Sequence, residues 1–183
     1  MTGLNERIAG ERRRLREVRQ TMTAATEQKA NGDSSFVPFY IAIADYFEAT
    51  MARLHGQDIR MDEMLRDKMD LEDPENMQAL EELGERLQGN QEHLKNLLAA
   101  REQLKSAGEA ALDCFESAAA AYSDFIVTNM GHHPGSTNLA AKLFTQDDWA
   151  YMADISPADQ VLEEQLYSQV FDHLPAALEL SQS

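Results

Sequence analysis

The stretch 36–65, FVPFYIAIADYFEATMARLHGQDIRMDEML, places apolar side chains three and four positions apart over its whole length. That spacing puts them on one face of an α-helix. Ser34 and Ser35 precede the stretch as candidate N-cap residues, and Pro38 falls in the first turn, where proline is tolerated. We therefore expect a long amphipathic helix that ends near Asp70. Its inner stripe consists of Tyr40, Ile43, Phe47, Met51, Leu54, Asp58, Met61 and Leu65.

Three further long helices are expected around this one. A helix from about Asn5 to Ala30 carries an apolar stripe that Glu11 interrupts, and Gly32 after it suits the left-handed geometry of a helix end. Asp73, followed by proline, is typical of a helix start, and the pattern there continues to about residue 106. A fourth helix is expected over residues 112–126.

Short connections between long helices favour antiparallel neighbours, so the fold class expected is all-α, an up-down four-helix bundle. We expect a single helical domain over residues 1–183, with long helices over about 5–130 and a loop over 130–138. The C-terminal flank, 139–183, should hold two shorter helices that lie against the bundle. Thr145 and Ser156 are their expected N-caps.

The composition is that of a packed globule from a reducing compartment. Hydrophobic residues make up 43% of the chain and charged residues 26%, which excludes a disordered chain. Cys114 is the only cysteine, so no internal disulfide forms, and its neighbours favour a small buried hydrophobic side chain. No N-terminal apolar signal region and no run of about 18 apolar residues occurs. We expect a cytoplasmic protein with no membrane partner.

The net charge of −16 is unevenly distributed. Residues 107–183 hold 12 acidic residues and a single basic one, Lys142. The segment 2–32 has the opposite sign, with seven basic and four acidic residues. Because so acidic a chain repels phosphate backbones, we expect no nucleic-acid partner. The run Arg12–Arg14 is either a local basic patch or a solvated helix face.

One set of polar residues stands on the inner side of the 36–65 helix. His55, Asp58 and Asp62 follow the spacing i, i+3, i+7, which brings them towards one face. A histidine and two carboxylates inside a bundle can bind a metal ion or a polar ligand. The alternative is a structural hydrogen bond of His55 without any ligand. Gly56 within this helix is the second unusual feature, because it admits close approach of a neighbour or a ligand.

His93, on the next helix, is the fourth candidate for this site. In an antiparallel pair of helices it should lie within about 6 Å of His55 along the bundle axis, given a rise of 1.5 Å per residue. It stands beside the apolar seam of its helix, not in it, which favours a flanking position outside the site.

The segment 55–60, HGQDIR, resembles over about ten residues the histidine segments that open the repeating motifs of hemerythrin-like bundles. That resemblance implies a helical bundle. The HxxxE and HxxxH pairs of that family are absent, since Ile59 stands four residues after His55 and Leu97 four after His93. We therefore transfer no di-iron ligands to this chain.

No motif in the sequence indicates catalysis or a cofactor. It contains neither a glycine-rich phosphate loop nor a GxSxG turn. We expect a non-enzymatic bundle that acts through contacts with a protein partner or with a second copy, as a homodimer. The basic first helix or the aromatic pair Trp149 and Tyr151 should form the contact. The alternative is a bundle that binds a small ligand or metal ion at His55, Asp58, Asp62 and His93.

Overall fold

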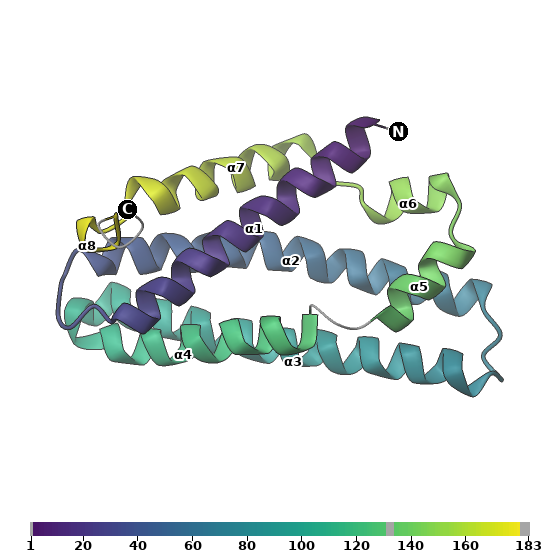
Figure 1. Ribbon diagram of the computed structural model, residues 1–183, viewed down its shortest axis with the longest axis horizontal. Helices are drawn as coiled ribbons and strands as arrows, with labels where there is room; N and C mark the ends of the chain where they lie inside the picture. The colour runs from purple at the N-terminus through teal and green to yellow at the C-terminus, as the bar shows by residue number, and fades with distance from the viewer. Residues whose placement is uncertain (1, 131–133, 180–183) are drawn as a thin grey trace.

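The computed structural model describes residues 2–130 and 134–179, and these residues form helices without any strand. Figure 1 shows the helices in order along the chain. They are α1 Thr2–Gln28, α2 Phe36–Lys68, α3 Pro74–Ala107, α4 Leu112–Phe125, α5 Pro134–Leu143, α6 Gln146–Met152, α7 Pro157–Asp172 and α8 Ala176–Glu179. A 3-10 turn, Gly108–Ala111, precedes α4, and a π-helical segment, Ile126–Met130, follows it.

The two longest helices, α2 and α3, lie antiparallel along the length of the molecule (Figure 1). The shorter α4 returns beside the C-terminal half of α3, while α1 crosses obliquely over the bundle. In the same half, α7 packs along α2, and α5 and α6 cover the opposite end. The all-α class is confirmed. The up-down four-helix arrangement is not, because α1 is oblique and α7 pairs with α2.

The C-terminal third differs from expectation in two ways. The loop expected over 130–138 is helical from Pro134 onward, and residues 131–133 lie outside the described residues. Proline suits a first helical position, and Gly135 lets α5 approach α3 closely, since a Cβ there would lie 3.2 Å from that of Ala79. The two helices expected beyond it exist as α6 and α7. However, α7 is part of the core, because Val170 is fully buried.

Three of the expected helix starts are confirmed by their capping bonds, whereas Ser35 stands at the N-cap position of α2 without a side-chain capping bond. The Asp73 side chain accepts a hydrogen bond from the Glu75 backbone N–H at 2.9 Å. Thr145 forms a capping box with Asp148, and Ser156 accepts from the Asp159 backbone N–H. Each bond satisfies a backbone donor that a helix N-terminus otherwise leaves open.

The end of α1 is held by a buried carboxylate instead of by Gly32. The left-handed residue directly after α1 is Lys29, with φ of 62°, although Gly32 is also left-handed at 83°. The next residue, Ala30, donates its backbone N–H to Glu116 of α4 at 2.7 Å. The Tyr40 hydroxyl donates to the same oxygen at 3.0 Å, which ties the α1–α2 turn to α4.

The apolar interior falls into two clusters at opposite ends of α2. The larger one fills the half covered by α1, α4 and α7, and its largest side chains are Tyr40, Tyr46, Tyr122, Phe36, Phe39, Phe47 and Phe115. The smaller one lies under α5 and α6 and consists of Met61, Leu65, Leu80, Leu83 and Ala140. Polar side chains of α1, α2 and α3 lie between the two clusters. Among the described helices, none is long and apolar enough to cross a membrane.

Candidate ligand cavity

A cavity of about 260 Å³ lies where the two apolar clusters meet. Helices α1, α2, α3, α5 and α6 all contribute to its wall. One part of the lining is apolar and consists of Ile8, Leu15, Leu54, Met61, Trp149 and Met152. The other part is charged, with Glu11, Arg12, Arg53, Asp58 and Arg86. Convergent polar groups in a largely apolar hollow are typical of small-molecule sites.

Part of this charged lining forms a closed ion network. Arg53 of α2 donates from Nη2 to Glu163 of α7 at 3.0 Å, and its Nη1 lies 3.3 Å from Glu11 of α1. Glu11 also accepts from Arg7 at 2.8 Å. The side chains of Arg53, Glu11 and Glu163 are at most 9% exposed. Together with Arg7 the network holds two cations and two carboxylates, so its charges compensate one another, although Nη1 of Arg53 makes no hydrogen bond.

Asp58 and Arg86 face the cavity without such a network. Burial raises the pKa of Asp58, against the opposing charges of Arg86 and His55. The Arg86 Nε is buried and has no hydrogen-bond partner among the described residues. Asp58 comes from α2 and Arg86 from α3, so the pair spans the interface of the two longest helices. A ligand could satisfy the Nε of Arg86, and equally the Nη1 of Arg53 and the Oγ1 of Thr50, which also line the cavity and are buried without a hydrogen-bond partner.

The structure does not assemble the four predicted site residues. Of these, Asp58 alone lines the cavity. Asp62 pairs with Arg66 through two hydrogen bonds, of 2.8 and 3.1 Å, on the outer surface of α2. With 3.6 residues per turn, Asp62 lies only about 20° around the helix from His55, whereas Asp58 lies about 60° away. Asp58 therefore turns inward, while Asp62 does not.

The two histidines have separate local partners. Nε2 of His55 lies 2.7 Å from the Gln91 side-chain amide of α3, an exposed contact, while its Nδ1 is buried without a hydrogen-bond partner. The His93 ring stacks on Phe125 with centroids 4.7 Å apart and lies parallel to Tyr122. These contacts place His55 at the α2–α3 interface and His93 at the α3–α4 interface.

No group of three His, Cys, Asp or Glu side chains within residues 2–130 and 134–179 could hold a metal ion. His132 and His133 lie outside the described residues. The Cβ position of Gly56 has no atom within 4 Å, so no neighbour requires a glycine there.

One expectation on a single side chain needs correction. Cys114 is exposed, because Phe115 takes the inward position on α4. Of the aromatic pair expected to form a contact, Trp149 is half-buried, lines the cavity and packs edge-on against Phe144. Tyr151 is 60% exposed, with the Arg60 guanidinium 5.8 Å from its ring centre.

Some lining residues were missed by sequence reasoning although the chain carried a signal for them. Glu11 interrupts an apolar stripe, and a charged residue in a stripe must find a buried partner. Arg53 stands next to the stripe residue Leu54 and supplies that partner. Arg86 carries no such signal, because its role depends on the packing of α3 against α2.

The chain matches no protein-family model, no curated protein and no solved structure.

Proposed function

We propose that this protein binds a small molecule in the cavity between α1, α2, α3, α5 and α6. The observation that supports this most is the pair Asp58 and Arg86, two charged groups directed into a hollow that offers them few partners. The two charges interact with each other, but the buried Nε of Arg86 lacks an acceptor, and the cost of such an unsatisfied donor is commonly retained where it serves binding. Bundles also build their ligand sites from facing helices in this way.

The cavity suits a compact ligand with an apolar body and a polar head. Its volume of about 260 Å³ lies just below the roughly 300–1,000 Å³ typical of pockets for drug-sized ligands. The apolar wall would receive the body of the ligand, and Asp58 with Arg86 its head. The ion network around Arg53 supports the wall beside them.

Trp149 provides a direct readout, because it is the only tryptophan and it lines the cavity. The experiment titrates the protein with 4-methylpentanoate, 4-methylpentanamide and 4-methylpentylamine while recording tryptophan fluorescence. These probes share one branched chain and carry negative, neutral and positive heads at pH 7. We expect a saturable change with at least one probe, confirmed by titration calorimetry.

A matched pair of variants locates the binding. Thr137 is an exposed residue that lines the cavity, and its neighbour Asn138 is exposed but does not. Thr137→Phe should weaken binding at least tenfold, whereas Asn138→Phe should leave it unchanged, with circular dichroism confirming the fold of both. Equal binding by both variants, or no saturable change with any probe, would contradict the proposal.

The protein-contact function expected from the sequence stays a prediction. Its aromatic surface is divided, since Trp149 faces the cavity and only Tyr151 is exposed. Sedimentation at several protein concentrations tests self-association directly.

A further inference from the structure

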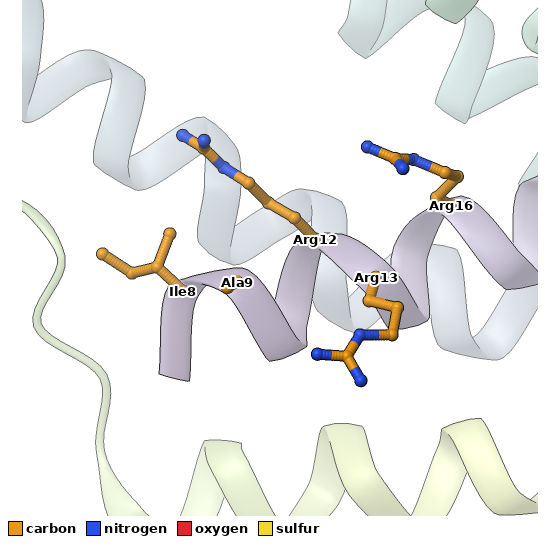
Figure 2. A pocket seen from close by; sticks show the side chains of 5 residues that line it. All are labelled: Ile8, Ala9, Arg12, Arg13 and Arg16. Atoms are coloured by element: carbon orange, nitrogen blue, oxygen red, sulfur yellow. The ribbon is translucent and has the colours of Figure 1, made fainter. Parts of the chain in front are cut away.

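Three arginines on α1 form a basic surface whose charges are not paired with carboxylates of the described residues. Arg12, Arg13 and Arg16 are exposed, and none has an ion pair or a hydrogen bond among the described residues. Figure 2 shows Arg12 and Arg16 extending from one side of α1 and Arg13 from the other. Together with Ile8 and Ala9 they line a shallow hollow of about 430 Å³.

This surface gathers three unpaired cations on one helix of an acidic chain. The net charge is −16, and many of the other cations have carboxylate partners, among them Arg7, Arg53, Arg66, Arg101, Lys68 and Lys105. Acidic side chains are thus abundant, yet none approaches Arg12, Arg13 or Arg16 within ion-pair distance in the described part of the chain. The result is a local positive potential on a molecule that otherwise repels anions.

The basic surface adjoins the entrance of the cavity. Ile8 and Arg12 line both the shallow hollow on α1 and the cavity beneath it. An anion attracted to Arg12, Arg13 and Arg16 therefore arrives at the opening. Charged groups at an entrance of this kind raise the association rate of a ligand of opposite sign.

Inside the cavity, Arg86 offers a hydrogen-bond donor that also favours an anionic ligand. Its buried Nε has no acceptor among the described residues. A guanidinium presents its N–H groups in a planar fork that fits a carboxylate. Asp58 lies close enough to Arg86 for their charges to interact, and its own negative charge disfavours a doubly charged phosphate beside it.

From these contacts we infer that the ligand of the cavity is an organic monocarboxylate, received by Arg86 and guided to the entrance by Arg12, Arg13 and Arg16. This inference rests on the proposed function. The apolar body of such a ligand would lie against Leu54, Met61 and Trp149.

The test compares affinities among probes that differ in the head alone. At pH 7 and low salt, 4-methylpentanoate should bind about tenfold or more tightly than 4-methylpentanamide, as a charged hydrogen bond to Arg86 requires. Both 4-methylpentylamine and 3-methylbutyl phosphate should bind more weakly than the carboxylate. Equal affinities for acid and amide, or tighter binding of the phosphate, would overturn the carboxylate assignment while leaving the proposed function standing. Failure of all four probes would remove both.

Variants distinguish the contribution of Arg86 inside the cavity from that of the arginines on α1. Arg86→Gln should remove the preference for the acid over the amide and leave amide binding intact. Arg16→Gln, at an arginine of the hollow that does not line the cavity, should slow association of the acid several-fold and reduce its salt dependence with little change in dissociation. Arg66→Gln, at an arginine that does not line the cavity, serves as the control of equal charge. An acid preference that survives in Arg86→Gln would contradict the role assigned to Arg86.

Discussion

At the scale of single residues, the position of Asp58 makes the stability of the protein depend on pH. It lies in the apolar stripe of α2, and burial raises the pKa of its carboxyl group. The folded protein therefore favours the protonated carboxyl more than the unfolded chain does. The stabilisation from this protonated form is fully present below the ordinary aspartate pKa of about 3.9, and it is lost as the pH rises through the raised value.

Asp58→Asn should therefore be more stable than the wild type at pH 7, because the amide avoids ionisation in a buried site. The difference should disappear as the pH is lowered through the ordinary aspartate range, where the wild-type carboxyl is protonated in both states. Urea unfolding at several pH values measures this. Asp62→Asn is the matched control and should bring no gain, because it removes the partner of Arg66. A loss of stability in Asp58→Asn at pH 7 would mean that the charge of Arg86 outweighs burial.

At the scale of secondary-structure elements, two glycines of α3 show where its packing is tight. A Cβ on Gly89 would lie 2.5 Å from a ring carbon of Phe125, the last residue of α4, and this ring also stacks on His93. Gly84, on the same helix, has nothing within 4 Å of its Cβ position. A side chain at position 89 therefore forces the Phe125 ring to move, whereas one at position 84 meets no neighbour.

We expect opposite effects from the same substitution at these two sites. Gly89→Ala should lower the free energy of unfolding by about 1–3 kcal/mol, because the Phe125 ring must move. Gly84→Ala should raise it by up to about 1 kcal/mol, since alanine favours a helix interior more than glycine does. Urea unfolding of both variants measures this. A stabilised Gly89→Ala would show that Phe125 finds an equally good position elsewhere.

At the scale of the whole molecule, the ion network around Arg53 joins helices that are distant in sequence. Glu11 belongs to α1, Arg53 to α2 and Glu163 to α7, and all three side chains are buried. Arg7, which pairs with Glu11, also donates to the backbone carbonyl of Ala153 between α6 and α7. The network therefore sets how the oblique α1 and the C-terminal helices sit on α2.

Arg53→Met should lower the free energy of unfolding by about 3–5 kcal/mol, because buried Glu163 loses its cation and Glu11 keeps only Arg7. Arg66→Met removes an exposed pair on the same helix and should cost no more than about 1 kcal/mol. Thermal and urea unfolding of both variants give the comparison. Similar small losses in the two would show that water or Arg7 compensates Glu11 and Glu163.

The sequence by itself determined the local structure of this protein. Spacing of apolar residues located the long helices, and Asp73, Thr145 and Ser156 located three helix starts, because periodicity and capping involve neighbours within one turn. The stripe of α2 also identified Asp58 as an inward-facing charge. These features need no knowledge of what packs against them.

Tertiary structure alone decided which faces meet and what lies between them. The oblique path of α1, the place of α7 in the core and the cavity itself follow from contacts between residues far apart in the chain, such as Arg53 with Glu163. An apolar stripe predicts that one face of a helix is buried. It does not predict which element buries it, because several elements could do so equally well. Packing also brings Arg86 of α3 and Arg12 of α1 to one cavity, which the sequence could not show because charges act through space and not along the chain.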